Sequence, residues 1–286
     1  MCNILFYKLK LVSLGKPLKE GILIMNILIS NDDGIYAEGI KILVNHLQDA
    51  GHTTYVVAPL EEQSGTGHGI TLHQPLRVKE VYRDNCLFGH SVSGKPADTI
   101  KVALAHLYDE KNIDFVISGI NRGANLGTDL FYSGTFAAAS EGTFWGKNAI
   151  ALSLIVDGND LYFESAGKFI AEYLKTIKDL KFPIGTLLNI NVPNLPMEDI
   201  KGIKYTKQSN RKFQEKLIER EDSQGNKYFW LGGHPIKGDH VENSDLEAVE
   251  NGYISITPVK LNLYDNELEV LLKENTKKEK YETNRS

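Results

Sequence analysis

The feature that most constrains this chain is the segment from Ile24 to Gly34, in which an apolar run is followed by Ser-Asn-Asp-Asp-Gly. Such a run, rich in β-branched residues, predicts a strand buried on both faces in a parallel sheet covered by helices. In open α/β sheets, ligands bind just beyond the carboxyl ends of the strands. Asp32 and Asp33 therefore fall where a ligand is expected, and two adjacent carboxylates there favour a bound cation that neutralises them.

Composition limits the classes of protein to which the chain can belong. Its 286 residues are enough for one large domain with an appendage, and 42% apolar and 24% charged residues are ordinary for a globular protein. The formal net charge of −5 gives no support to binding of a nucleic-acid backbone. Cys2 and Cys86 lie far apart without metal-ligand spacing, which excludes a disulfide framework and favours a reducing, cytoplasmic setting.

The first 24 residues differ from the rest of the chain. Lys8 and Lys10 interrupt their apolar stretch, whereas a signal peptide carries its positive charges before the apolar core. No apolar stretch approaches the roughly 18 residues of a membrane span, so no membrane partner is expected. Met25 stands at the start of the first predicted strand. We expect the functional chain to begin there, with residues 1–24 as an extension that follows a misassigned start codon.

From Met25 to about residue 200, strand-like and helix-like segments alternate. This alternation predicts parallel βαβ units with right-handed crossovers, hence a doubly wound, Rossmann-like α/β catalytic domain with a mostly parallel sheet. A stretch at 70–93 alternates with turn signals and predicts a β excursion. The expected strands are 25–30, 53–58, 115–118, 149–155 and 187–192, and the expected helices are 38–48, 96–108, 134–145 and 162–178.

The character of the chain changes after Pro193 and Pro196. Residues 203–232 predict two strands around the polar turn 221–226, and a short helix at 245–250 and a strand at 253–257, ended by Pro258, follow. Residues 201–286 are too few and too polar for a core of their own. They predict a C-terminal β-hairpin arm and tail that pack on the main domain or on a second subunit.

Two loops at predicted strand ends carry chemistry early in the chain. Asn31–Gly34 holds the two carboxylates, and the alternative is a turn with a helix cap, for which Asn and Asp are common. The loop Gln63–Gly69 has three glycines that permit close approach of the backbone to a ligand, with a flexible surface loop as the alternative. Its spacing matches neither a dinucleotide fingerprint nor a phosphate-binding P-loop.

Two further loops follow at later strand ends. Ser118–Gly127 contains Asn121 and Asn125, which either form turns or supply amide oxygens and nitrogens to a ligand. Tyr132–Thr135 directly precedes an Ala-rich helix, where Ser or Thr is a routine N-cap. The free N–H groups and two hydroxyls at such a helix N-terminus also predict a phosphate site.

Together, the loops supply a set of oxygen ligands without a thiolate: the carboxylates of Asp32 and Asp33, the hydroxyl of Ser64 and the amide oxygen of Asn121. Such hard ligands suit Mg²⁺, Mn²⁺ or Ca²⁺ better than Zn²⁺. A divalent ion beside an anion-binding helix N-terminus is what phosphoryl chemistry requires, because the ion offsets charge on the transferring group.

At this point the chain resembles the SurE family, the survival-protein E nucleotidases. The resemblance runs in order from Met25 to about Pro258, and residues 1–24 have no counterpart in it. Lys95 stands where the family usually has Thr. The matching segments are Asn31–Ile35, Gly39–Ile40, Val57–Pro59, Gln63–Gly65, Gly94–Asp98, Ser118–Gly123, Ser133–Thr135, Asn189–Pro193 and Gly252–Pro258.

The resemblance implies a metal-dependent phosphomonoesterase that hydrolyses nucleoside 5'-monophosphates, with a specificity broad enough for 3'-nucleotides and short polyphosphate. It implies one divalent cation, Mg²⁺ or Mn²⁺, per subunit, a cytoplasmic location, and a homodimer or homotetramer assembled through C-terminal arms. The implied metal ligands are Asp32, Asp33, Ser64 and Asn121, and the implied phosphate-binding residues are Asn125, Ser133, Gly134 and Thr135.

No catalytic residue is assigned, since no Ser-His-Asp or Cys-His arrangement is evident and a covalent intermediate is not required. His68 has three roles open to it: to stabilise charge, to protonate the leaving oxygen, or only to shape the glycine turn. Two alternative functions stay open. A haloacid-dehalogenase-type phosphatase needs its two carboxylates two residues apart, whereas Asp32 and Asp33 are adjacent. A non-catalytic nucleotide-binding regulatory module would give little reason for an uncompensated acidic pair.

Overall fold

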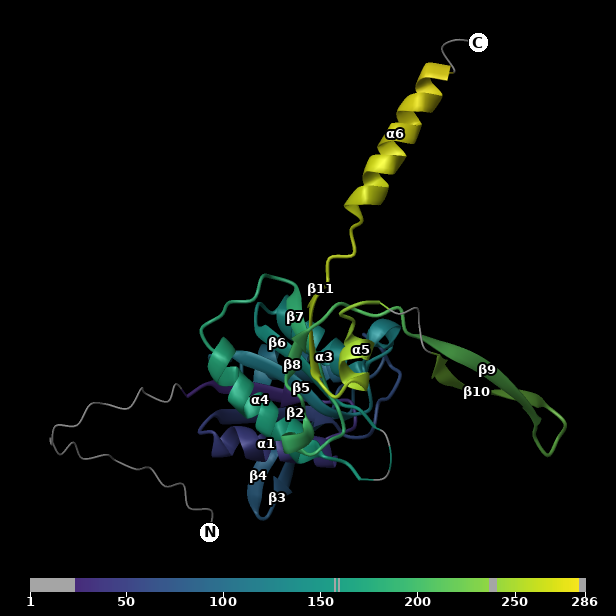
Figure 1. Ribbon diagram of the computed structural model, residues 1–286. Helices are drawn as coiled ribbons and strands as arrows, with labels where there is room; N and C mark the ends of the chain where they lie inside the picture. The colour runs from purple at the N-terminus through teal and green to yellow at the C-terminus, as the bar shows by residue number, and fades with distance from the viewer. Residues whose placement is uncertain (1–23, 157, 159, 237–240, 283–286) are drawn as a thin grey trace, which may run out of the picture.

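A single large sheet organises the protein (Figure 1). The computed structural model describes residues 24–156, 158, 160–236 and 241–282, so almost all of the expected extension, residues 1–23, lies outside the described part. The sheet has nine strands, and two further strands form a separate hairpin. The strands are β1 (Asn26–Ser30), β2 (Thr53–Pro59), β3 (Val78–Arg83), β4 (Cys86–Val92), β5 (Phe115–Arg122), β6 (Asn148–Leu154), β7 (Thr186–Val192), β8 (Ile203–Tyr205), β9 (Lys212–Glu221), β10 (Lys227–Ile236) and β11 (Ile254–Lys260).

The strand order of the large sheet is β3-β4-β2-β1-β5-β6-β7-β11-β8. Strands β4, β2, β1, β5, β6 and β7 run parallel to one another, and the antiparallel pairs are β3 with β4 and β7 with β11. The chain leaves β1 toward β2 on one side and later enters β5 on the other side. This point is the topological switch of the sheet, where open α/β sheets bind ligands. The predicted doubly wound, mostly parallel architecture is confirmed.

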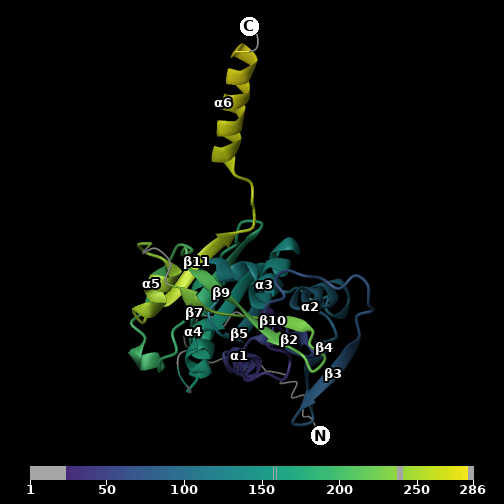
Figure 2. The same ribbon diagram turned by 90° about the vertical axis from the view of Figure 1, so that its right-hand side faces the viewer.

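Helices cover both faces of the sheet (Figure 2). Helices α1 and α4 pack against each other on one face, and α2 and α3 pack against each other on the other. Each of the four predicted helices is present, although α2 continues after Val102 as a π-helical turn. The helical segments are α1 (Glu38–Asp49), α2 (Pro96–Val102), η1 (Ala103–Leu107), η2 (Gly127–Phe131), α3 (Gly134–Phe144), α4 (Phe163–Ile177), η3 (Met197–Asp199), α5 (Asp245–Glu250) and α6 (Asn266–Glu282).

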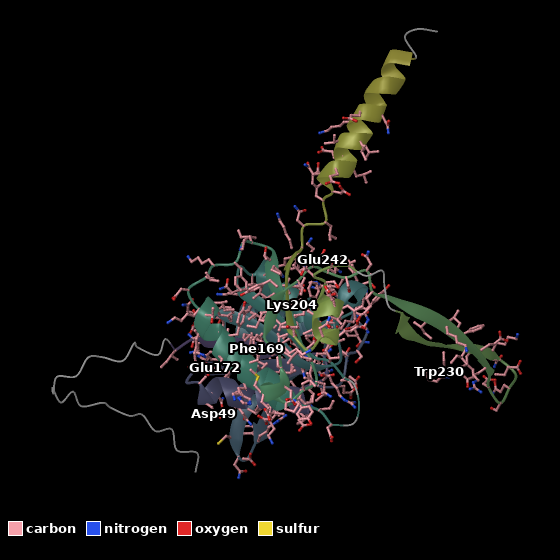
Figure 3. The ribbon with its side chains drawn as sticks, in the orientation of Figure 1. Asp49, Phe169, Glu172, Lys204, Trp230 and Glu242 are labelled. Carbon is pink, nitrogen blue, oxygen red and sulfur yellow. The ribbon has the colours of Figure 1, made fainter. Side chains whose placement is uncertain are left out.

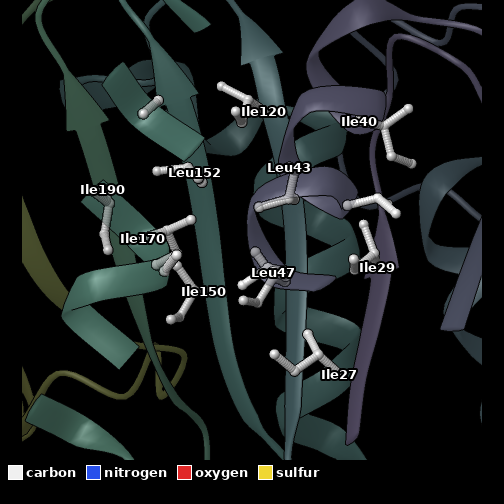
Figure 4. Close-up of a cluster of buried hydrophobic side chains, with 14 of the residues drawn as sticks. Ile27, Ile29, Ile40, Leu43, Leu47, Ile120, Ile150, Leu152, Ile170 and Ile190 are labelled. Carbon is white, nitrogen blue, oxygen red and sulfur yellow. The ribbon is translucent and has the colours of Figure 1, made fainter. Parts of the chain in front are cut away.

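Alternation along the central strands fills both layers of the core. Ile27 and Ile29 of β1 point to the layer of α1 and α4, and Leu28 points to the layer of α2 and α3. Figure 4 shows the first layer, in which Leu43 and Leu47 of α1 lie over the strands. Because successive side chains of a strand point to opposite faces, an unbroken apolar run is the sequence of a strand that is buried on both sides.

The C-terminal part divides between the large sheet and the hairpin. Strands β8 and β11 join the sheet beyond β7, whereas β9 and β10 pair with each other and project from the body (Figure 1). The turn predicted at 221–226 joins these two strands. Helix α6 extends away from the body in another direction and was not anticipated from the sequence. No helix in the described ranges has the length and apolar character needed to cross a bilayer.

Two strand boundaries differ from the prediction. Pro258 was expected to end its strand, but β11 continues to Lys260. Because β8 pairs only with Ile254–Ile256, Pro258 lies beyond the end of β8, where a missing N–H is tolerated at a sheet edge. The third loop was expected directly after Ser118, but β5 resumes its pairing with β6 at Asn121 and Arg122 after an irregular stretch.

Candidate active site

The loops that follow β1, β2 and β5 meet the N-terminus of α3 at the switch point of the sheet. Asp32 is the centre of this meeting point. Its carboxylate Oδ1 accepts a hydrogen bond from the Thr135 hydroxyl, and its backbone carbonyl accepts one from the N–H of Gln63 at 2.7 Å. Asp32 is thereby joined to the first turn of α3 and to the residue before Ser64. The predicted convergence of these loops is present in the structure.

Asp32 is almost completely buried, with 5% of its surface exposed. Burial raises the pKa of its carboxyl from 3.8 to about 6, against the hydrogen bond from Thr135 and with a further contribution from the charge of Asp33. A carboxylate is expensive to keep ionised in such a place unless a positive charge lies close by. A cation bound beside Asp32 would offset this cost and favour the ionised form.

Asp33 lies beside Asp32 and is tied to the end of β5. Its Oδ2 accepts a hydrogen bond from the backbone N–H of Arg122 at 3.0 Å, although the two residues are 89 positions apart in the chain. Burial raises the pKa of Asp33, and the nearby carboxylate of Glu62 raises it further, whereas the hydrogen bond and the charge of Arg122 lower it. Both carboxyls of the pair are thus held above their ordinary pKa.

Ser64 and Asn121 lie next to residues that contact the acidic pair. Ser64 is exposed and donates its hydroxyl hydrogen to Glu62 Oε1 at 2.7 Å, so the lone pairs of its oxygen stay available. The side-chain nitrogen of Asn121 donates to the carbonyl of Gly123 at 3.0 Å. Because this nitrogen is turned into its own loop, the amide oxygen is the atom turned away from it. Two of the four predicted metal ligands are the acidic pair itself. The other two, Ser64 and Asn121, are each adjacent in sequence to a residue whose N–H donates to that pair.

The environment of the acidic pair fits a divalent cation. Among the ion pairs of the part of the chain that the structure describes, none involves Asp32 or Asp33. Next to them, the side-chain oxygen of Asn31 is buried without a hydrogen-bond partner from the described residues. No three His, Cys, Asp or Glu side chains gather as a metal-binding group in the same ranges. The predicted ligands are carboxylate, hydroxyl and amide oxygens, which is a set for a hard ion.

The start of α3 forms the other half of the site. Ser133 is the N-cap of this helix, and its hydroxyl oxygen accepts from the N–H of Phe136 at 3.0 Å. Thr135 is fully buried and holds Asp32. Gly134 lies directly against Asp32, because a Cβ atom at this position would meet the Asp32 Cβ at 2.7 Å. The phosphate-binding role of these three residues stays a prediction.

Asn125 sits in a buried asparagine network. Its backbone N–H donates to Asn191 Oδ1 at 2.9 Å, and its carbonyl accepts from the side chains of Asn189 and Asn191, each at 2.9 Å. Its own side-chain nitrogen donates to Ser153 at 2.8 Å. The network ties the loop after β5 to β6 and β7. A direct contact of Asn125 with phosphate stays a prediction.

The base of the hairpin rests on the loop that leads to the helix N-terminus. Gln208 donates to the carbonyl of Gly127 at 2.6 Å, and the Thr128 hydroxyl donates to the carbonyl of Arg211 at 2.8 Å. The buried carboxylate of Asp245 accepts from the N–H of Gly127 at 2.9 Å and from that of Ser209 at 3.0 Å. The hairpin is thus anchored a few residues before Ser133.

A comparison with known families decides what this arrangement belongs to. The family model described as "Survival protein SurE" matches residues 27–215, the range that contains every candidate ligand. This chain belongs to the SurE family. The resemblance read from the sequence is thereby confirmed.

Relatives and a solved structure agree with this assignment. The chain is 47% identical to a 5'-nucleotidase SurE of Petrotoga mobilis, over 82% of this chain and 92% of the relative. It is 45% identical to a 5'-nucleotidase SurE of Kosmotoga olearia over the same shares of both chains. The crystal structure of the SurE protein from Aquifex aeolicus matches with a TM-score of 0.75 and 35% identity, over 88% of this chain and 99% of that one.

Sequence reasoning missed several residues that shape the SurE site in this chain. The backbone N–H of Arg122 and the carboxylate of Glu62 carry no motif that would mark them. Glu141 was missed as well, although a signal was present, because it is the only charged residue in the Ala-rich helix 134–144. A lone charge among small and apolar residues on a buried helix must have partners, which the sequence does not identify.

Proposed function

We propose that this protein is a metal-dependent 5'-nucleotidase, which hydrolyses nucleoside 5'-monophosphates to nucleosides and phosphate. One observation carries the proposal: the buried carboxylate of Asp32, with its raised pKa, touches the N-terminus of α3 through Thr135 and Gly134. A cation site in contact with a helix N-terminus combines two sources of positive charge, the ion and the helix dipole, and both stabilise the negative charge of a phosphate monoester. The printed function of the relatives, 5'-nucleotidase, supports the same reaction.

The ion belongs to the oxygen atoms of four side chains, those of Asp32, Asp33, Ser64 and Asn121. We propose one Mg²⁺ or Mn²⁺ per subunit. When bound there, the ion supplies a Lewis acid that offsets charge on the phosphoryl group and activates water. The chain keeps these oxygens in place: Thr135 holds Asp32, and the backbone N–H of Arg122 holds Asp33.

Phosphate binding belongs to the first turn of α3. The first N–H groups of a helix have no partner within the helix, and the helix dipole favours an anion at this end. Ser133 already satisfies the N–H of Phe136, and the hydroxyl of Thr135 is engaged with Asp32. We therefore assign the phosphate oxygens to backbone N–H groups around Gly134, where the lack of a side chain permits close approach. Asn125 contributes indirectly, by fixing the loop that leads to α3.

Substrate range, location and assembly complete the proposal. The site has an open, exposed side at Ser64 and no enclosing pocket is needed to bind a phosphoryl group, so 3'-nucleotides and short polyphosphate are included among the substrates. We place the enzyme in the cytoplasm and expect a homodimer or homotetramer. The exposed apolar side chains of the hairpin support assembly, because such surfaces are usually covered by a partner.

The decisive experiment uses purified full-length protein stripped of metal by a chelator. It is assayed for phosphate release from a panel of phosphomonoesters, with Mg²⁺, Mn²⁺, Ca²⁺ or Zn²⁺ added back singly. We expect release from nucleoside 5'-monophosphates only after addition of Mg²⁺ or Mn²⁺. The matched variant Asp32→Asn removes one charge and keeps the shape, so its metal affinity and turnover should both fall while its fold is kept.

Three outcomes would contradict the proposal. Full activity of Asp32→Asn at low metal concentration would remove the acidic pair from the site. Nucleotide binding by the intact protein without metal-dependent turnover would favour the non-catalytic regulatory module. A trapped aspartyl-phosphate would instead point to the haloacid-dehalogenase type of chemistry, because hydrolysis by a metal-activated water forms no covalent intermediate.

A further inference from the structure

A buried carboxylate on α3, Glu141, connects three elements away from the acidic pair. Its Oε1 accepts from Lys101 of α2 at 2.6 Å and from the indole N–H of Trp145 at 3.3 Å, and its Oε2 contacts His68 Nε2 at 3.1 Å. Only 4% of the side chain of Glu141 is exposed. Burial raises the pKa of Glu141, but the hydrogen bonds from His68 and Lys101 outweigh burial and hold the pKa below its ordinary value. Glu141 is therefore a fixed anion within the fold.

His68 belongs to the glycine-rich loop Gln63–Gly69 and reaches across to α3. Its ring stacks on Phe144, with centroids 5.6 Å apart and an interplanar angle of 17°. Glu141 lies seven residues after Gly134, which is about 10 Å along a helix. The imidazole is therefore directed to the C-terminal half of α3 rather than to its N-terminus, where the phosphate is expected.

The same loop carries Ser64, and it is held at both ends. At its start, the N–H of Gln63 donates to the carbonyl of Asp32 at 2.7 Å. At its far end, the N–H of Gly67 donates to the carbonyl of Tyr132 at 3.0 Å, and His68 then contacts Glu141. Ser64 lies between these two attachments. Its position relative to Asp32 depends on how firmly the far end is fixed.

We propose that His68 and Glu141 are positioning residues for the metal site, which hold the loop so that Ser64 stays in reach of the cation. This inference rests on the proposed function, because it takes Ser64 as a metal ligand. Lys101 and Trp145 fix the carboxylate, the carboxylate fixes the imidazole, and the imidazole fixes the loop. A loop that is already ordered loses less conformational entropy when the ion binds, and the affinity for the ion is higher for that reason.

The test separates this role from proton transfer by His68. Mn²⁺ affinity of the full-length protein is measured by isothermal titration calorimetry, and kcat is measured at saturating Mn²⁺. In His68→Ala we expect about tenfold weaker Mn²⁺ binding, as is typical for groups that orient ligands, with kcat largely kept once the metal saturates. His68→Gln, whose amide nitrogen can still donate to Glu141, should regain most of the affinity.

Three measurements complete the design. Amide hydrogen exchange of residues 63–69 should become faster in His68→Ala and in Glu141→Gln. The double variant, His68→Ala with Glu141→Gln, should bind Mn²⁺ no more weakly than whichever single variant binds it less tightly, because both changes break the same contact. The control is His73→Ala, an exposed histidine further along the same segment, which should leave affinity and exchange unchanged.

Two results would overturn the inference. One is unchanged Mn²⁺ affinity together with unchanged exchange in His68→Ala. The other is a loss of kcat by about a hundredfold at saturating Mn²⁺ with unchanged affinity, the size of effect that a general acid produces. Asp32→Asn distinguishes failure of the positioning role from failure of the metal site itself. If it abolishes Mn²⁺ binding while His68→Ala does not weaken it, only the positioning role fails; if neither affects binding, the metal site itself is wrong.

Discussion

Gly134 and Asp32 are in direct contact across the site: a Cβ atom at position 134 would lie 2.7 Å from the Cβ of Asp32 and 3.0 Å from its Oδ2. The Cγ of Pro96 would lie 2.9 Å away from the same atom. No real Cβ atom tolerates such distances, so the helix start and the carboxylate approach this closely only because residue 134 is glycine. The contact is therefore part of how the site is built, in addition to any close approach of a phosphate.

The smallest change that tests this contact is Gly134→Ala. The added methyl group must displace Asp32 or the start of α3, so we expect Mn²⁺ affinity to fall about tenfold and kcat/KM to fall with it. Calorimetry and steady-state assays measure the two effects. The control is Gly232→Ala in β10, where an added Cβ meets its nearest neighbour at an ordinary 3.4 Å. Equal metal affinity in Gly134→Ala and wild type would show that the carboxylate can move freely.

The raised pKa of Asp32 predicts a pH dependence of stability in the metal-free protein. Since the pKa in the folded state, about 6, exceeds 3.8, the folded protein binds the proton more tightly than the unfolded chain. The stabilisation is complete below pH 3.8 and is lost as the pH rises through 6. From the size of the shift it amounts to about 3 kcal/mol at most.

Urea unfolding of chelator-treated protein between pH 4 and 7.5 measures this loss. Asp32→Asn lacks the titrating group and does not lose this stabilisation. Its free energy of unfolding minus that of wild type should therefore increase as the pH rises from 4 to 7.5. Saturating Mn²⁺ should reverse the trend for wild type, because the ion competes with the proton for the carboxylate. Parallel curves for the two proteins without metal would contradict the prediction.

The asparagine network predicts a stability effect without loss of the metal ligands. Asn191→Ala removes the acceptor for the N–H of Asn125 and one of the donors to its carbonyl, both in buried positions. We expect a loss of roughly 1–3 kcal/mol in the free energy of unfolding. KM should rise as the loop before α3 loosens. Asn262→Ala, which removes an exposed acceptor for the N–H of Tyr264, serves as control and should change stability little. A loss of equal size in both variants would argue against the network.

The hairpin predicts self-association. Phe229 and Leu231 alternate with Trp230 along β10, and all three are more than half exposed, at 56%, 70% and 64%. Figure 3 shows Trp230 on the projecting hairpin. We expect light scattering to show a homodimer or larger assembly for the intact chain at micromolar concentration. Replacement of the three residues by Ser should shift it to a monomer. An intact chain that is already monomeric would refute the prediction.

A second comparison tests the role of the tail. Truncation after Pro196 should leave a poorly soluble or monomeric core, because it removes β8 and β11 as well as the hairpin and uncovers the edge of β7. A variant with only the hairpin replaced by a short turn keeps these strands. It should therefore stay soluble and monomeric, whereas a truncated core as soluble as the intact chain would contradict this account.

The central part of the fold followed from local sequence because its signals are local. The run at 24–30 and the helical spacing of Ile40, Leu43 and Leu47 each reflect burial of a face, which the amino acids report directly. The passage of β5 through Asn121 did not follow, because its pairing with β6 resumes after an irregular stretch that depends on the partner strand. The extension of β11 through Pro258 depends likewise on where β8 ends.

The candidate site divides in the same way. Asp32, Asp33, Ser64 and Asn121 were predicted because together they offer oxygen ligands at successive strand ends, and the structure brings their loops together. The contacts of Glu141 were not predictable, because Lys101 and His68 reach it from separate elements. The phosphate-binding role of Thr135 stays a prediction, and the contact that the sequence did not identify is the hydrogen bond of its hydroxyl to Asp32. A hydroxyl at a helix start has several possible acceptors, and only the packing of strand and helix selects one.

The hydrogen bond between Asp33 and the backbone of Arg122 spans 89 positions of the chain. During synthesis it can therefore form only long after Asp33 has been made. Strand β1 is made early, but its neighbour β5 leaves the ribosome only after the intervening strands have been made. A nascent chain that ends before Arg122 carries both carboxylates but lacks the backbone N–H that holds Asp33. The appearance of Mn²⁺ affinity during refolding or translation would therefore date the insertion of β5 beside β1, and the ion would serve as a reporter of that late step.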